Sequence, residues 1–253
     1  MKTWKKALLF ALCLLPVGLI GGWFSAEMTI ASTDPAMLES LAAQAGSLQA
    51  VKAVTAASAV VYAVVCGFLG YILAEKLGLM RPLRLENPPV IRLLLIASAC
   101  AAVFSLDAWT FAAWIPELGE AYAGAGAFDA ATWLASLLYG GVIEEVMLRL
   151  FLMSLLALAV WKLGFRTREQ PPQQALIAAN VLAALVFAAA HLPATVLSFG
   201  HLTPLLTLRC FLLNGASGLL FGHYYRKYGI QSAMLSHMLF HLVSRTIWLL
   251  FLP

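Results

Sequence analysis

Residues 134–160 read LASLLYGGVIEEVMLRLFLMSLLALAV, an apolar run whose only charged side chains are Glu144, Glu145 and Arg149. A run of this length can cross the hydrocarbon core of a bilayer, which takes about 20 apolar residues. A charge near the bilayer centre costs at least ~2.5 kcal/mol on insertion scales, so such residues usually have a functional or pairing role. The run therefore predicts a membrane-spanning helix that carries a polar site.

The composition of the whole chain is typical of a membrane protein. Of its 253 residues, 62% are hydrophobic and 11% are charged, whereas soluble domains carry about 25% charged residues. The four cysteines all fall in apolar runs and form no Cys-x-x-Cys pair, which indicates neither a disulfide framework nor a thiolate metal site. The net charge of +4 is not gathered into a basic patch, so we expect no nucleic-acid partner.

Apolar runs long enough to span a bilayer recur along the chain. They cover residues 7–24, 52–74, 93–115, 131–162, 175–192, 204–225 and 230–252. We therefore predict an all-α, polytopic transmembrane helical bundle of about seven spans, forming a single membrane-embedded domain over residues 1–253. Lysines precede the first run, as in a secretory signal, but bulky Phe24 fits a small-x-small cleavage site badly. We expect the first helix to be retained.

The basic residues are distributed unequally between the two sets of loops. With the amino terminus inside, only Lys52 lies on the outer side, while Arg149, Arg209 and Arg245 lie within spans. The remaining basic residues fall on the inner side: Lys2, Lys5, Lys6, Lys76, Arg81, Arg84, Arg92, Lys162, Arg166, Arg168, Arg226 and Lys227. Because cytoplasmic loops collect Lys and Arg, we predict an integral protein of a bacterial inner or plasma membrane with a cytoplasmic amino terminus.

The connecting segments carry local signals. In the long outer segment 27–50, Thr33-Asp34-Pro35 is typical of a helix start, with the aspartate as cap and the proline at the first helical position. We expect a short interfacial helix there. The inner segments 75–89 and 165–174 contain prolines and are predicted to be polar turns.

Spacing within the fourth run separates its two glutamates. Glu145 and Arg149 are four residues apart with the acid first, so they share a helix face in the favourable order for an ion pair. Glu144 lies about 100° around an α-helix from Glu145, which allows it to point into a different cavity. We interpret Glu145 and Arg149 as a structural pair and Glu144 as a free carboxylate.

Histidines occur on two further runs. The fifth contains Phe187-x-x-x-His191, and the seventh contains His237 and His241, four residues apart. With ~1.5 Å of rise per residue, His191 lies about 24 Å from the cytoplasmic end of its run and His237 about 10 Å from the end of its own. A shared site therefore requires that helix tilt or stagger bring these residues to the same depth.

Three fragments of the sequence together resemble the signature of the CPBP family of intramembrane proteases: Glu144-Glu145-x-x-x-Arg149, then Phe187-x-x-x-His191, then His237 with a polar residue four positions later. This family includes the type II CAAX prenyl endopeptidases and bacteriocin-processing or immunity proteins. The resemblance covers residues from about 130 to 245. The three preceding spans, within residues 1–127, carry none of these fragments and agree with the resemblance only as further predicted membrane helices.

The resemblance implies a role for each motif residue. Glu144 activates a water molecule with the help of His191; Glu145 and Arg149, with Phe187, support the helices; His237 and His241 stabilise the oxyanion. The sequence departs from the family at His241, where members usually carry Asn. An Asn amide is always a donor, whereas a neutral imidazole offers one N–H and a charged one two. A second departure is Leu150, where members often carry glycine directly after the arginine.

Two hydrolytic routes fit these residues. In the first, Glu144 and His191 activate water directly. In the second, Glu144, His191 and His237 hold Zn²⁺ with a water in the fourth position, as in His₂Glu catalytic sites. The ligands would come from three separate helices and no His-Glu-x-x-His motif is present, which favours the metal-independent route. Zinc remains the alternative cofactor.

The predicted function is therefore that of an intramembrane endopeptidase, whose partners are the bilayer and a peptide or protein substrate at the membrane. Two other classes remain open. Intramembrane Glu, Arg and His also serve proton or metal transporters, although we find no interrupted helices in matching halves of the chain. A catalytically silent scaffold or immunity-type regulator would retain the same fold.

Overall fold

A computed structural model describes residues 1–82, 88–123 and 126–252, and all regular structure within them is helical. The elements are α1 (Thr3–Ala31), α2 (Pro35–Ala45), α3 (Leu48–Lys76), α4 (Pro88–Ser105), η1 (Leu106–Ala108), η2 (Phe111–Ala113), α5 (Pro116–Ala123), α6 (Ala130–Leu134), η3 (Ala135–Glu144), η4 (Val146–Met153), α7 (Ser154–Gly164), α8 (Gln173–Ala190), α9 (Leu192–Phe199), α10 (Pro204–Tyr228) and α11 (Ile230–Phe251). The predicted all-α class is confirmed.

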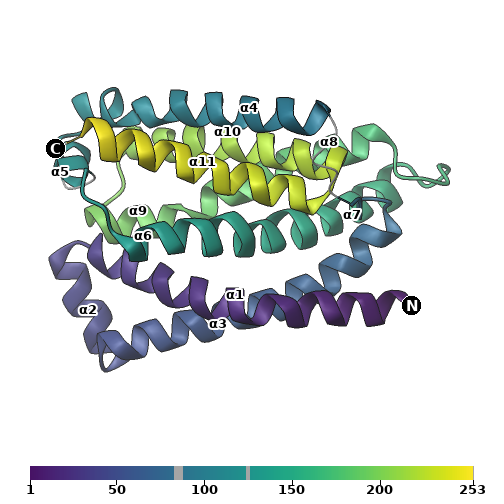
Figure 1. Ribbon diagram of the computed structural model, residues 1–253, viewed down its shortest axis with the longest axis horizontal. Coiled ribbons are helices and arrows are strands. Elements are labelled where there is room, and N and C mark those ends of the chain that lie inside the picture. The colour runs from purple at the N-terminus through teal and green to yellow at the C-terminus, as the bar shows by residue number, and fades with distance from the viewer. Residues whose placement is uncertain (83–87, 124–125, 253) are drawn as a thin grey trace.

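Seven segments are long and apolar enough to cross a membrane, as predicted, and they indicate an integral membrane protein. They are Thr3–Ala31, Leu48–Lys76, Ile91–Ala113, Ala130–Gly164, Gln173–Phe199, Pro204–Tyr228 and Ile230–Phe251. The first is longer than the predicted 7–24. The two termini lie at opposite ends of the bundle (Figure 1), as an odd number of spans requires. Arg84, assigned above to an inner loop, lies outside the described residues.

Small residues fill the contact between the first two spans. On α1 and α3, Ala11 and Ala59 are fully buried, whereas Leu9 and Val61 are more than half exposed. A Cβ added to Gly22 would lie 2.6 Å from the Cβ of Ala59, so these backbones are in close contact. Lipid tails solvate large apolar side chains as well as a protein core does, and small residues let helices approach. The large residues are therefore free to face outward.

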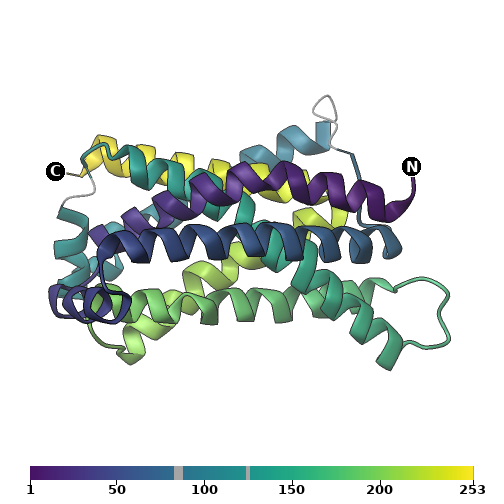
Figure 2. The same cartoon turned by 90° about the horizontal axis from the view of Figure 1, so that it is seen from below.

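The fourth span lies at the centre of the bundle. Its residues contact α1 and α3 on one side and α8, α10 and α11 on the other, and the views in Figures 1 and 2 show it between these two groups. Gly70 of α3 contacts it directly, because an added Cβ there would lie 2.9 Å from the backbone of Leu150. Gly141 lets α11 approach from the other side, because a Cβ added to this glycine would lie 3.2 Å from the Cα of Met238.

The fourth span is not a regular α-helix. Between α6 and α7 it has π-helical turns, over Ala135–Glu144 and Val146–Met153. The α-helical spacing expected from the sequence is therefore wrong over these stretches, because the apolar pattern is the same for α- and π-helical turns. π-Helical turns are rare and occur often at functional sites. The two glutamates stand at the junction of the two π-helical stretches.

The predicted caps and turns are largely found. Asp34 accepts hydrogen bonds from the backbone N–H groups of Ala36 and Met37, which starts α2 at Pro35 as expected. Its own N–H donates to the carbonyl of Leu197, which ties α2 to α9. The predicted turn at 165–174 is confirmed between α7 and α8. The predicted turn at 75–89 is shorter at its carboxyl end, since α4 begins at Pro88; residues 83–87 within it lie outside the described ranges.

Candidate active site

Glu145 joins the fourth span to the seventh. Its side chain is fully buried. Oε1 accepts a hydrogen bond from Nη1 of Arg149 at 2.8 Å and lies 2.8 Å from Nδ1 of His237. A carboxylate only accepts, so the Nδ1 of His237 carries the proton in this contact. The carboxylate thus fixes both the orientation and the tautomer of an imidazole on α11.

Arg149 connects the same group to two more helices. Its guanidinium donates through Nη2 to the carbonyl of Gly218 on α10 at 3.3 Å. It lies 4.4 Å from the ring centre of Phe187 on α8 and 5.4 Å from that of Phe221 on α10. A buried cation between a carboxylate and two aromatic faces is stabilised by charge and by the ring quadrupoles. Four helices are therefore held together at this point.

Glu144 points elsewhere. It is half-buried, whereas Glu145 is fully buried. Among the described residues, the Glu144 carboxylate has no hydrogen-bond partner, and it lines a central cavity together with His191, His237 and His241. The two adjacent glutamates therefore face different surroundings, one a buried ion pair and the other an open space.

His237 and His241 stack on α11 with ring centres 4.8 Å apart and an interplanar angle of 24°. His237 also stacks on Phe221 at 4.3 Å. A Cβ placed on Gly140 would lie 2.9 Å from Nε2 of His241 and 3.9 Å from Nε2 of His237. Both Nε2 atoms thus face the fourth span at a glycine one turn before Glu144. A side chain at that position would occupy the space in front of both nitrogens.

His191 follows the last residue of α8 and is fixed by its own chain. Its Nδ1 lies 2.8 Å from the carbonyl oxygen of Phe187. A carbonyl only accepts, so Nδ1 is the donor, and Nε2 of the neutral ring is left as an acceptor. The ring of Phe187 contacts both imidazoles, with its centre 4.6 Å from that of His191 and 6.1 Å from that of His237. The difference in depth expected from residue counts is closed by this packing.

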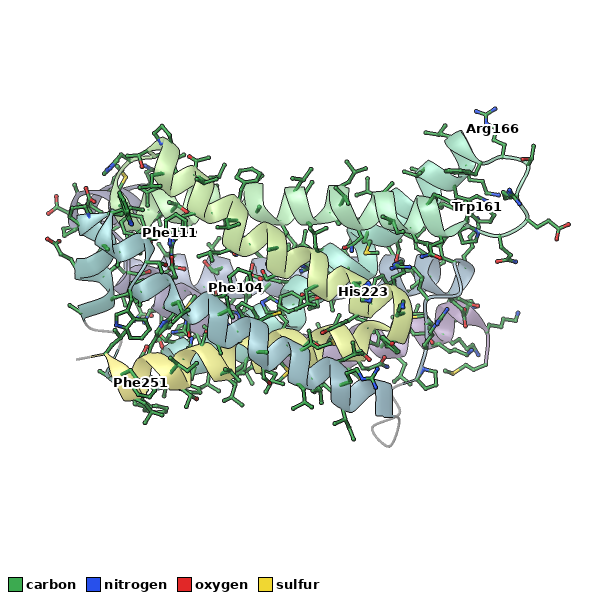
Figure 3. All side chains as sticks on the ribbon, turned by 90° about the horizontal axis from the view of Figure 1, so that it is seen from above. Phe104, Phe111, Trp161, Arg166, His223 and Phe251 are labelled. Atoms are coloured by element: carbon green, nitrogen blue, oxygen red, sulfur yellow. The ribbon has the colours of Figure 1, made fainter. Side chains whose placement is uncertain are left out.

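The central cavity collects all four candidate side chains in a volume of about 650 Å³. Phe104 of α4 also lines it. In Figure 3, Phe104 lies between the end of the bundle marked by Phe111 and Phe251 and the end marked by Trp161 and Arg166. The cavity is thus inside the predicted membrane region. Water that entered it would meet a carboxylate and three imidazoles.

The donor set does not fit a resident metal. No group of three His, Cys, Asp or Glu side chains within the described ranges is arranged to hold a metal ion. Of the three residues proposed as zinc ligands, His237 has Nδ1 engaged by Glu145 and stacks face to face with Phe221. His191 has its Nδ1 engaged by the carbonyl oxygen of Phe187.

A second polar cluster lies outside the motif residues. Asp107 and Arg209 are each other's partners in it. Nε of Arg209 lies 3.0 Å from both carboxylate oxygens of Asp107, and the hydroxyl of Tyr122 donates to the same carboxylate at 2.6 Å. Burial and the nearby carboxylate raise the pKa of Tyr122 well above its usual value, so it remains a donor. A separation of 102 residues left no sequence signal for this pair.

Comparison with protein families identifies the region that holds the four candidate residues. Residues 126–243 match the model of the family described as type II CAAX prenyl endopeptidase Rce1-like. No match was found among curated proteins or solved structures. The matched region includes the fourth to sixth spans and most of the seventh, and therefore the whole Glu–Arg–His arrangement described above. Residues 126–243 of this integral membrane protein thus form a domain of the Rce1-like type II CAAX prenyl endopeptidase family, within the CPBP proteins.

Proposed function

We propose that this protein is an intramembrane endopeptidase in which Glu144 and His191 activate water without a metal ion. The observation that carries this proposal is the single cavity that joins an unpartnered carboxylate on the fourth span to imidazoles on the fifth and seventh. Family membership implies a peptidase, and the geometry supports these residues as its chemical groups.

The first step is attack of water on the carbonyl carbon of the substrate. Glu144 accepts a proton from the water, and the Nε2 of His191, left free by the bond of Nδ1 to the Phe187 carbonyl, is a second acceptor. The new C–O bond forms as the carbonyl π electrons move to oxygen. The tetrahedral intermediate then collapses, the C–N bond breaks, and the proton held by Glu144 passes to the leaving amine.

The oxyanion of that intermediate requires donors. His237 and His241 are the imidazoles on α11 that can supply N–H groups to it. His237 directs its Nδ1–H at Glu145 and its Nε2 at the cavity. Nε2 of His241 faces the same space beside Gly140, and we assign it as an oxyanion donor. In enzymes where a single oxyanion donor was removed, about 3 to 4 kcal/mol of barrier stabilisation was lost.

The test is proteolysis of a panel of membrane-anchored reporter peptides by purified protein in liposomes. We expect Glu144→Ala, His191→Ala and His237→Ala to remain folded and to lose cleavage by about 10²- to 10⁴-fold. Glu169→Gln, an exposed carboxylate in the loop after α7, is the matched control and should cleave normally. Full cleavage by Glu144→Ala would overturn the mechanism.

The same assay separates the remaining alternatives. Cleavage should persist in a chelator, and inhibition that added Zn²⁺ reverses would select the zinc route instead. The presence of His241 where the family usually carries Asn favours the silent-scaffold reading as a second candidate. In that case the wild type would cleave no reporter, while His241→Asn would be the variant most able to gain activity.

A further inference from the structure

The central cavity is built from one half of the bundle. On α1 its lining comes from Ser25, Met28 and Thr29, near the carboxyl end of that helix. On α10 the lining residues lie between Arg209 and Phe221, so the last turns of that helix take no part. On α11 the lining begins only at His237. All these portions lie toward the end of the bundle that holds the carboxyl terminus (Figures 1 and 2).

A second hollow continues the cavity toward that end. This outer vestibule, of about 770 Å³, is lined partly by the ends of spans and partly by segments outside them, among which are Asp34, Glu117 and Asp129. Met28, Arg245 and Trp248 line both the vestibule and the central cavity. Glu117, Glu120 and Asp129 are exposed side chains, and an exposed ionised carboxylate favours water over lipid. The vestibule is therefore the aqueous side of the route.

Arg245 and Trp248 form the throat between the two hollows. Nε of Arg245 donates to Oγ of Ser136 at 2.7 Å, which holds the guanidinium across the passage from α11 to the fourth span. Nε1 of Trp248 donates to the carbonyl of Ser105 at 2.9 Å, and its ring packs on that of Tyr122 at 5.1 Å. A substrate segment that enters from the vestibule passes Arg245 before it reaches His241 and His237.

The opposite half of the bundle is filled by side chains. Tyr225 is fully buried and its hydroxyl lies 2.6 Å from Oγ of Ser154, which joins α10 to α7. Leu79 and Ile230 are each 1% exposed and belong to the same apolar cluster as Tyr225. These residues lie between the candidate active site and the loops that carry most of the basic residues. Packing at this density leaves little room for a peptide.

We infer that the substrate reaches the active site from the non-cytoplasmic side of the membrane, through the outer vestibule and past Arg245. The basic loops and the amino terminus lie at the packed end, and the positive-inside rule assigns that end to the cytoplasm. The substrate is then a polypeptide segment exposed at the outer surface, from an exported or membrane-anchored protein. The inference rests on the proposed function for the claim that the occupant is a substrate; the route itself does not.

The size of the cavity limits the occupant. Its volume of about 650 Å³ lies in the range of small-ligand pockets, which runs from about 300 to 1,000 Å³. A folded domain does not fit, whereas an extended stretch of a few residues does. The substrate therefore presents an unfolded tail or loop to the vestibule.

Thiol labelling of single-cysteine variants in bacterial cells tests the route. The starting variant has Cys13, Cys66, Cys100 and Cys210 replaced by alanine. Asn214→Cys and Thr55→Cys place thiols on two different walls of the cavity. Leu212→Cys, two residues from Asn214 but on the outward face of α10, is the lipid-facing control. Arg166→Cys, in the exposed loop after α7 (Figure 3), reports the other side of the membrane. Elution as a single species in detergent checks that each variant is folded.

A membrane-impermeant maleimide added to intact cells should label Asn214→Cys and Thr55→Cys and leave Arg166→Cys unlabelled until the cells are permeabilised. Leu212→Cys should remain unlabelled throughout. Labelling of Arg166→Cys in intact cells, or labelling of both cavity cysteines only after permeabilisation, would overturn the inference. Because labelling requires no hydrolysis, an inactive enzyme with the expected labelling would refute the protease assignment and leave the route in place.

Discussion

Within the described residues, the Glu145–Arg149 ion pair is fully buried and the Asp107–Arg209 pair partly buried, and the two differ in which polar atoms around them remain unpaired. In the Asp107–Arg209 cluster, both carboxylate oxygens are hydrogen-bonded and Tyr122 adds a further donor. In the Glu145–Arg149 cluster, Oε2 of Glu145 is buried and has no partner among the described residues. The adjacent Glu144 is likewise left free. Both carboxylate oxygens of the Asp107–Arg209 pair therefore have partners, whereas the Glu145–Arg149 pair leaves one carboxylate oxygen without a partner and lies beside the free carboxylate of Glu144 at the cavity.

The comparison shows that charge inside a membrane does not by itself identify a site. Both pairs cost insertion energy, and both join helices that are distant in sequence. Only the pair in the fourth span orients a neighbouring imidazole and stands next to a free carboxylate. Buried polar groups that lack partners call for an explanation, and a catalytic role is one of them.

The largest effects are expected when the arginine is removed from each ion pair. Removing one partner of a buried pair leaves an uncompensated charge and destabilises a protein by about 3 to 5 kcal/mol. We expect Arg149→Met and Arg209→Met to lower the thermal unfolding temperature in detergent to a similar extent. Cleavage per folded molecule should be lost only in Arg149→Met, because Arg149 shares the carboxylate that orients His237. Equal loss of activity in both variants would remove the distinction between the pairs.

A smaller effect is expected at Gly140. A methyl group there would lie 2.9 Å from Nε2 of His241 and would force that ring to move. We expect Gly140→Ala to fold normally and to lose about 10²-fold in cleavage rate, the size of one lost oxyanion donor. Gly164→Ala is the control, since a Cβ at that position meets nothing within 4 Å. Normal activity in Gly140→Ala would argue against a role for the His241 nitrogen.

The smallest effect is expected at Tyr122. Tyr122→Phe removes one donor from the Asp107 carboxylate, which remains paired with Arg209. A hydrogen bond to a charged group contributes about 1.5 to 3 kcal/mol, so unfolding should shift modestly and cleavage should not change. A loss of cleavage with unchanged stability would show that the cluster of Asp107, Arg209 and Tyr122 takes part in catalysis and does not only stabilise the fold.

The sequence predicted those parts of the molecule that depend on local pattern. Runs of apolar residues indicated the seven spans, and the Asp34-Pro35 start of α2 followed from capping rules. The Glu145–Arg149 contact also followed from spacing, because i,i+4 residues share a helix face. In each case the physical cause lies within a few residues along the chain.

The remaining features depend on how distant segments pack. The contact between Glu145 and His237 joins residues 92 apart, and no periodicity encodes it. Counting residues along straight helices placed His191 and His237 at different depths, but both contact the ring of Phe187 and line one cavity. The π-helical turns of the fourth span could not be predicted from the sequence either, because they alter the backbone hydrogen bonding and leave the apolar pattern intact.

The contact between Gly70 and Leu150 has a consequence for protein engineering. Leu150 lies against α3 where that helix carries Gly70, since a Cβ added to Gly70 would lie 2.9 Å from the Leu150 backbone. The matched region begins at residue 126, so this contact joins it to a helix outside the match. A fragment that began at residue 126 would expose this face of the fourth span, and we expect it to fold poorly unless the first three spans were supplied as a separate chain.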